Sequence, residues 1–395
     1  MRIAFVSLMY DAPWGGSEVL WTHTAARALA QGHEVLVSFY AWPETAAPLQ
    51  ALEAKGAQVL RRTRYEPDLR RRAVKWLARA PWGGQLPEVR ALAQFKPDIV
   101  LINQAGWMDL FFHKQLADWL RHVPFVLACH NYQDPVRQRD FSRAQIGHMY
   151  SQAKEVLMIS ENQLCTLQRQ LVDPIANARV VQNPLNLPAT YPVPRSSTTN
   201  NAVQLAVVAS FDVDRKGQDV LLQALTASEW AERNVCLNFY GKGPDQVYLE
   251  QLIHFYGLAG RVRLCGHVDD AAAIWRENDL LVIPSRIESG PMVLQEAMLC
   301  GRPVVATDVG MVREWLDDDE TGFIADASSA TSLNKALSRA WARRADWPTM
   351  GAQAAARTHT RLENDSVGDL LQRLVSYAVN SCLPIQSGKP LTDRR

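Results

Sequence analysis

Hydrophobic residues in the first half of the chain form short continuous runs, separated by longer stretches with helical spacing. The runs stand at 3–8, 34–40, 98–103, 125–130, 155–160 and 178–183. Continuous runs, rather than alternation of apolar and polar positions, are typical of strands covered on both faces. The pattern predicts a parallel α/β sheet, with a first helix from about Glu18 to Gln31 that Gly32 ends.

A second series of runs follows a proline-rich segment. Residues 184–200 contain four prolines and a Ser/Thr cluster, which is typical of a domain linker. The later runs stand at 203–210, 235–241, 262–267, 279–285, 303–310 and 321–326. The sequence therefore predicts two Rossmann-like α/β domains, at 1–185 and 201–362, with a cleft between them.

The end of the chain has a different pattern. Residues 370–379 are amphipathic and predict a helix, whereas 383–395 are polar and predict a disordered tail. Ligands of open α/β sheets bind beyond the carboxyl ends of the strands. We therefore expect the functional residues directly after the apolar runs.

Composition narrows the class of protein. A length of 395 residues suits two domains, and a net charge of +1 argues against a dedicated nucleic-acid binder. The six cysteines are scattered without metal-ligand spacing and are interpreted as reduced thiols. No run reaches the ~18 apolar residues of a spanning helix, and the first run is too short for a secretory signal. These features predict a soluble, cytoplasmic protein.

The segment 288–310 carries the most chemical information. Glu288 follows a predicted strand, and Pro291 suits the first turn of a helix that Gly301 ends. The free N–H groups at such a helix start favour an anion, most simply a phosphate; they belong to Ser289, Gly290, Met292 and Val293.

A second carboxylate stands beside this predicted phosphate site. Glu296 lies one turn beyond Met292, on the same side of the helix. Carboxylates accept two hydrogen bonds and suit pairs of sugar hydroxyls. A phosphate flanked by two hydroxyl acceptors describes a nucleotide-sugar. The alternative is a buried strand–turn–helix with two solvated glutamates.

The whole string resembles the Glu-x7-Glu signature of family 4 of the retaining glycosyltransferases, and the resemblance covers about residues 1–380. It implies a GT-B fold, a C-terminal helix at about 365–380 that crosses back to the first domain, and sugar transfer without a catalytic metal or a cofactor. It implies that Glu288 contacts the donor sugar and that Glu296 holds the ribose. The family usually has Glu-Gly-x-Pro where this chain has a serine before Gly290.

The loop after the run at 203–210 also resembles the family. Lys216 aligns with the lysine that holds the donor diphosphate, where a positive charge stabilises the leaving group. Ser210 stands where the family usually has an arginine, and Arg215 is a candidate to supply that charge. Asp212 begins a DxD sequence, which we interpret as loop structure rather than a metal site.

Weaker resemblances extend the predicted donor site. Gly241 lies in a Gly-x-Gly turn that either faces the nucleotide or is only a tight turn, and His267 and Val268 resemble the lining of the base pocket. In the first domain, Gly16 resembles the loop that closes over the phosphates, and Ser17 is a candidate N-cap.

Other candidates end strands of the first domain. His130 resembles a histidine near the donor sugar's primary hydroxyl, with a satisfied core histidine as the alternative. Ser160, Glu161 and Asn183 also stand where the family has polar strand ends.

The basic stretch 61–79 predicts a peripheral contact with an anionic membrane, with a solvated arginine-rich face as the alternative. The resemblance implies a retaining transferase that moves a hexosyl group from a UDP- or GDP-sugar to a glycan or lipid-linked acceptor. Cell-surface polysaccharide or lipopolysaccharide biosynthesis, at the inner membrane surface, is an expectation from the resemblance. The alternatives are a non-catalytic GT-B scaffold or sugar-nucleotide-binding protein, a GT-B epimerase or phosphorylase, and an NAD-binding enzyme; the last lacks GxGxxG after the first run.

Overall fold

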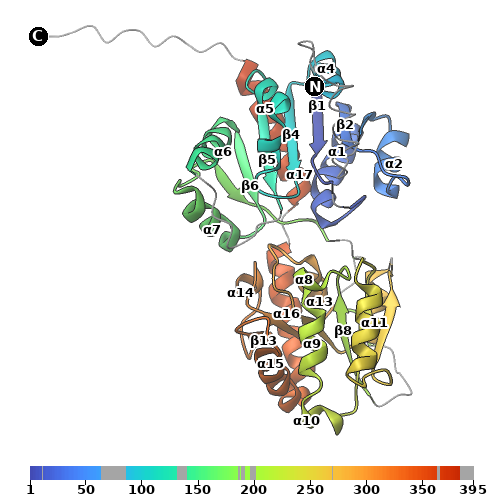
Figure 1. Ribbon diagram of the computed structural model, residues 1–395. Coiled ribbons are helices and arrows are strands. Elements are labelled where there is room, and N and C mark those ends of the chain that lie inside the picture. The colour runs from blue at the N-terminus through green and yellow to red at the C-terminus, as the bar shows by residue number, and fades with distance from the viewer. Residues whose placement is uncertain are drawn as a thin grey trace, which may run out of the picture.

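The computed structural model describes residues 1–10, 12–63, 86–130, 140–185, 187, 192–195, 202–268, 270–362 and 365–382. These residues form two α/β units, each built on a parallel sheet. Figure 1 shows the N-terminal unit above the C-terminal unit. No helix among the described residues is long and apolar enough to cross a bilayer.

The N-terminal sheet has seven strands in the order β3-β2-β1-β4-β5-β6-β7, all paired in parallel. The strands are β1 (Arg2–Ser7), β2 (Glu34–Tyr40), β3 (Gln58–Arg62), β4 (Ile99–Gln104), β5 (Phe125–Cys129), β6 (Glu155–Met158) and β7 (Ala178–Val180). The strand order reverses between β1 and β4. Such a switch point leaves a crevice at the carboxyl ends of the two strands.

Helices cover both faces of this sheet, and each face has its own apolar core. They are η1 (Gly16–Glu18), α1 (Val19–Ala30), α2 (Ala47–Ala54), α4 (Pro87–Phe95), η2 (Asp109–Phe112), α5 (Lys114–Leu120), α6 (Asp140–Gln152) and α7 (Glu161–Leu171). The helix predicted near the end of the chain is α17 (Ser366–Cys382). It packs against α1 and β4, and Leu370 and Leu374 are fully buried in that core.

The C-terminal sheet has six strands in the order β10-β9-β8-β11-β12-β13. They are β8 (Val203–Val208), β9 (Val235–Tyr240), β10 (Val262–Gly266), β11 (Leu280–Ile283), β12 (Val304–Thr307) and β13 (Gly322–Ala325). The order reverses between β8 and β11, which pair directly. The loops that follow these two strands therefore lie side by side.

The C-terminal sheet is also covered on both faces, and the two faces have separate cores. Its helices are α8 (Val213–Lys216), α9 (Gln218–Ala224), α10 (Ser228–Ala231), α11 (Gln246–Phe255), α12 (Ala271–Glu277), α13 (Met292–Leu299), α14 (Val312–Trp315), α15 (Ala330–Ala342), η3 (Arg344–Asp346) and α16 (Trp347–Leu362).

Every predicted apolar run contains a strand, but β3 was not predicted. β3 is an edge strand, half exposed, and it ends in Arg61 and Arg62. Of the first residues of the basic stretch, Arg62 is buried, whereas Arg61 is exposed and pairs with Glu53. Residues 64–79 of that stretch, much of the predicted linker and the predicted tail at 383–395 lie outside the described residues.

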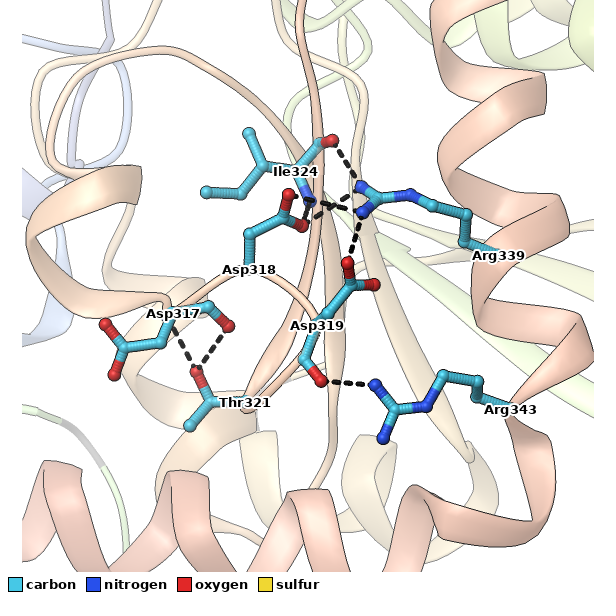
Figure 2. Close-up of polar contacts among 7 residues, drawn as sticks. All are labelled: Asp317, Asp318, Asp319, Thr321, Ile324, Arg339 and Arg343. Atoms are coloured by element: carbon cyan, nitrogen blue, oxygen red, sulfur yellow. Dashed lines mark hydrogen bonds and ion pairs between the residues drawn. The ribbon is translucent and has the colours of Figure 1, made fainter.

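An acidic loop joins α14 to β13. Asp318 and Asp319 both pair with Arg339 of α15, which also donates to the carbonyl of Ile324 (Figure 2). Asp317 pairs with Arg357 of α16. These carboxylates are therefore engaged in fastening helices to the edge of the sheet.

Candidate functional site

Lys216 and Glu288 meet at the switch point of the C-terminal sheet. Lys216 lies in the loop after β8 and Glu288 in the loop after β11, and Lys216 Nζ lies 2.6 Å from Glu288 Oε1. The two side chains are only 16 % and 11 % exposed. Ser285 Oγ donates to the same carboxylate oxygen at 3.0 Å. The pair is thus held in one geometry before any ligand arrives.

Local backbone structure places Lys216 at the end of a single helical turn. The side chain of Asp212 caps α8 by accepting from the N–H of Arg215, which confirms that Asp212 has a structural role in the loop. The carbonyl of Arg215 accepts from the N–H of Arg286 at 2.8 Å and so joins this loop to the one that carries Glu288.

Gly217 ends α8 with a left-handed conformation, at φ 64°. A Cβ at this position would collide with the carbonyl oxygen of Pro284, which begins the Glu288 loop. Glycine therefore allows the close approach that brings Lys216 to Glu288.

Gly217→Ala is expected to destabilise the protein more than Gly257→Ala. Gly257 has a similar φ of 68° but open space around it, so alanine there costs about 1 kcal/mol of backbone strain. At Gly217 the collision adds roughly 1–3 kcal/mol. Urea unfolding of both variants measures the difference, and equal losses would contradict this account of the loop contact.

The predicted phosphate turn precedes α13. Pro291 is the N-cap of α13, so the prediction that it lies inside the first turn was wrong by one residue. Within the described residues, the N–H groups of Gly290, Met292 and Val293 have no hydrogen-bond acceptor. The carbonyl of Ser289 accepts from Met311 at 3.0 Å, which fixes the turn against the segment after β12.

Glu296 lies one helical turn beyond Met292 and is largely buried. Burial raises the pKa of Glu296 to about 7. In the described part of the chain its carboxylate has neither a hydrogen-bond donor nor an ion-pair partner. A largely buried carboxyl without partners costs folding free energy when it is ionised, and a bound hydroxyl would offset that cost.

The N-terminal unit contacts this turn at two points. A Cβ at Gly16 would lie 2.9 Å from the sulfur of Met292, and a Cβ at Gly290 would collide with Ile159, just after β6. The side-chain amide of Asn183 donates to the carbonyl of Gly16 at 3.3 Å. The Gly16 loop therefore lies directly against the start of α13.

A third contact joins the units through the start of α7. Glu314 of α14 accepts from the N–H groups of Glu161 and Asn162 at 3.2 and 2.9 Å. Ser160 caps the same helix by accepting from Gln163. The start of α7 in the N-terminal unit is thus bound by the carboxylate of Glu314 from the C-terminal unit.

His130 lies at the end of β5 and is 6 % exposed. Its Nε2 lies 2.7 Å from Asn103 Oδ1, and burial lowers its pKa to about 4. His130 is therefore neutral near pH 7. Strand order places it at the same end of the sheet as the start of α1, and Asn103 lies between it and Glu18.

The remaining predicted residues have varied settings. Ser17 makes no N-cap hydrogen bond, so that prediction was wrong; Gly15 precedes a 3-10 turn there instead. Gly241 is packed against Ala209, so its turn lies next to exposed Ser210. His267 is exposed and Val268 packs on the C-terminal core.

Three polar residues are buried, which sequence reasoning did not predict. Glu18, Asn103 and Arg62 are 3 %, 1 % and 6 % exposed. Asn103 donates to Glu18, and Arg62, at the end of the edge strand β3, donates to the carbonyl of Ser7 at the end of β1. Each lies at the edge of an apolar stretch, where its burial is not visible in the sequence. No group of three or more His, Cys, Asp or Glu side chains able to hold a metal occurs among the described residues.

Comparison with known families decides the classification. Residues 14–187 match the family described as Glycosyltransferase Family 4, and residues 202–343 match the one described as Glycosyl transferases group 1. The chain belongs to family 4 of the group 1 glycosyltransferases. The two matches follow one another along the chain and correspond to its two α/β units.

Individual relatives match this family 4 protein over shorter segments. A phosphatidyl-myo-inositol mannosyltransferase of Mycobacterium leprae is 38 % identical over 130 residues, 32 % of this chain and 34 % of that protein. A D-inositol 3-phosphate glycosyltransferase of Xylanimonas cellulosilytica is 34 % identical over 184 residues, 42 % of this chain and 44 % of that protein. The match thus spans less than half the length of either relative.

The structural match extends over most of the chain. HepE from Anabaena, solved in complex with UDP-glucose, superposes with a TM-score of 0.74 over 95 % of this chain and 99 % of its own, at 20 % identity. The fold of this family 4 member is therefore GT-B.

Proposed function

We propose that this protein is a retaining glycosyltransferase that moves a hexosyl group from a UDP- or GDP-sugar to a glycan or lipid-linked acceptor. The observation that carries the proposal is the Lys216–Glu288 pair at the edge of a helix start whose N–H groups lack acceptors within the described residues. Family membership and relatives named as sugar transferases support it.

The donor diphosphate lies on the N–H groups of Gly290, Met292 and Val293, with Lys216 beside it. Cleavage of the glycosidic bond leaves negative charge on the diphosphate, which the helix start and Lys216 stabilise. The N–H groups and Lys216 supply this positive charge without a metal ion. The reaction needs no cofactor besides the nucleotide-sugar substrate. The family usually has an arginine at the position of Ser210. Arg215, five residues further along the same loop, supplies the second positive charge to the diphosphate instead.

Glu288 orients the donor sugar and does not act as a nucleophile. Its carboxylate is already bonded to Lys216 and Ser285, which fixes it for hydrogen bonding to sugar hydroxyls. The acceptor hydroxyl attacks on the face that the diphosphate leaves, and a phosphate oxygen takes its proton, so the anomeric configuration is retained. Contact between the Gly16 loop and Met292 keeps water away from the reacting carbon.

The proposed acceptor carries a lipid. The relative from M. leprae is named for a lipid acceptor, which supports a lipid-linked substrate and a peripheral membrane contact through residues 61–79. A role in cell-surface polysaccharide or lipopolysaccharide assembly follows from such an acceptor. A non-catalytic sugar-nucleotide-binding protein is the second candidate, because an uncharged serine, Ser210, stands in the diphosphate loop.

A donor panel separates these two candidates. The full chain is incubated in EDTA with UDP-glucose, UDP-N-acetylglucosamine, GDP-mannose and ADP-glucose, and release of the nucleoside diphosphate is measured with and without sugar-lipid acceptors. A glycosyltransferase releases diphosphate from one nucleotide class, faster with acceptor. Binding of a donor without any release would favour the non-catalytic protein.

A further inference from the structure

A buried chain of hydrogen bonds links the start of α1 to His130. Asn103 Nδ2 donates to Glu18 Oε1 at 2.8 Å, and Asn103 Oδ1 lies 2.7 Å from His130 Nε2. Glu18 Oε1 also accepts from Ser7 Oγ at 3.0 Å, and Oε2 accepts from Trp21 Nε1 at 3.0 Å. All these side chains belong to residues less than 9 % exposed.

The directions of these bonds follow from the chemistry of the two ends. An indole N–H can only donate, so Trp21 requires an acceptor at Glu18. An ionised Glu18 accepts on both oxygens, so the Asn103 amide must turn its NH₂ toward the carboxylate. Its carbonyl oxygen then faces His130, and that oxygen can bond the ring only if Nε2 carries the hydrogen.

The ionisation of Glu18 depends on its buried surroundings. Burial raises the pKa of Glu18 to about 7, and the hydrogen bonds from Ser7 and Trp21 and the positive charge of Arg62 limit that rise. Above pH 8, Glu18 is therefore ionised. His130, with its pKa lowered to about 4, is neutral at the same pH.

We propose that Glu18 and Asn103 are positioning residues that hold His130 as the Nε2–H tautomer, so that its Nδ1 accepts a hydrogen bond from a hydroxyl of the sugar substrate. Nδ1 has no hydrogen-bond partner within the described residues. The role in sugar binding rests on the proposed function, whereas the control of the tautomer does not. With the hydrogen on Nε2, Nδ1 can only accept, so the ligand must supply a hydrogen-bond donor. In the opposite tautomer Nδ1 would carry the hydrogen and would require an acceptor on the ligand.

Glu18→Gln tests this chain of hydrogen bonds, because glutamine has the same shape as glutamate. Trp21 still requires an acceptor, so the introduced glutamine is expected to turn its oxygen to Trp21 and its NH₂ to Asn103. Asn103 then turns its oxygen to that glutamine and its NH₂ to His130, which must accept at Nε2. The variant is therefore expected to convert His130 to the Nδ1–H tautomer.

The measurement is a two-bond ¹H–¹⁵N correlation spectrum of the full chain labelled at histidine nitrogens, at pH 8.5, without substrate. His130→Gln identifies the resonances of His130 among those of the nine histidines. Wild type is expected to show a protonated Nε2, and Glu18→Gln a protonated Nδ1. In an Asn103→Ala background, Glu18→Gln is expected to leave the tautomer unchanged, because the link between them is gone.

A protonated Nδ1 of His130 in wild type would overturn the proposal. Retention of the wild-type tautomer in Glu18→Gln would overturn it as well. Kinetics with the active donor give a second readout: Glu18→Gln is expected to lower kcat/KM about tenfold, the value of one hydrogen bond. If the spectra are as expected but no donor assay shows transfer, the proposed function is contradicted, whereas the control of the tautomer stands.

Discussion

Lys216→Ala is expected to lower kcat/KM for sugar transfer by about 10²–10³-fold, the effect of removing one preorganised charge from a developing anion. The lysine is held against Glu288 in a largely buried setting, 16 % exposed, where water screens its charge weakly. Most of the loss is expected in kcat, because the leaving diphosphate gains negative charge in the transition state. Initial rates of diphosphate release measure the effect.

Lys335→Ala is the matched control, because Lys335 is an exposed lysine on α15 of the same unit. It is expected to retain wild-type kcat and KM. Lys216→Arg separates charge from shape, since the guanidinium keeps the charge but is larger than the ammonium group. Wild-type activity in Lys216→Ala would contradict the assignment of this residue to the leaving group.

Glu296→Gln is expected to stabilise the free protein at high pH. Burial raises the pKa of Glu296 from 4.5 to about 7, so the folded state binds the proton more tightly than the unfolded state. Its ionisation therefore destabilises the fold progressively as pH rises from about 4.5 to 7, and fully above 7. At pH 8 the neutral glutamine avoids a cost on the order of 3 kcal/mol.

The measurement is thermal unfolding of wild type and Glu296→Gln at pH 4.5 and pH 8. Nearly equal Tm values are expected at pH 4.5, and a variant several degrees more stable at pH 8. The same variant is expected to bind nucleoside diphosphate about tenfold or more weakly at pH 8, because it loses a charged hydrogen-bond acceptor. Gains in both stability and affinity would contradict a ligand-binding role for this carboxylate.

The sequence predicted the parts of the fold that bury continuous apolar runs. All strands except β3 follow from such runs, because a strand covered on both faces needs apolar residues at every position. β3 lies at the edge of its sheet and ends in two arginines, so its pattern resembles an exposed segment. The capping role predicted for Ser17 failed because a 3-10 turn begins before it.

The site was predictable where the strand order brings loops together. Lys216 and Glu288 are 72 positions apart, yet they follow β8 and β11, which are neighbours at the switch point. Three features of the site depend on side-chain directions. They are the bond between Lys216 and Glu288, the Glu296 carboxyl, which has no partner among the described residues, and the chain of hydrogen bonds from Glu18 to His130. Those directions arise only when the separate strands are packed, so no local pattern in the sequence predicts them.

The most direct test of the account is thermal stabilisation of wild type and Glu296→Ala by UDP, GDP and ADP in EDTA at pH 8. A nucleotide at 100 times its Kd adds about 2.7 kcal/mol to stability. We predict that one base class shifts the Tm of wild type without a metal ion, and that the shift is lost in Glu296→Ala. The absence of a shift with every nucleotide, or equal shifts in both proteins, would contradict a nucleotide-sugar site at α13.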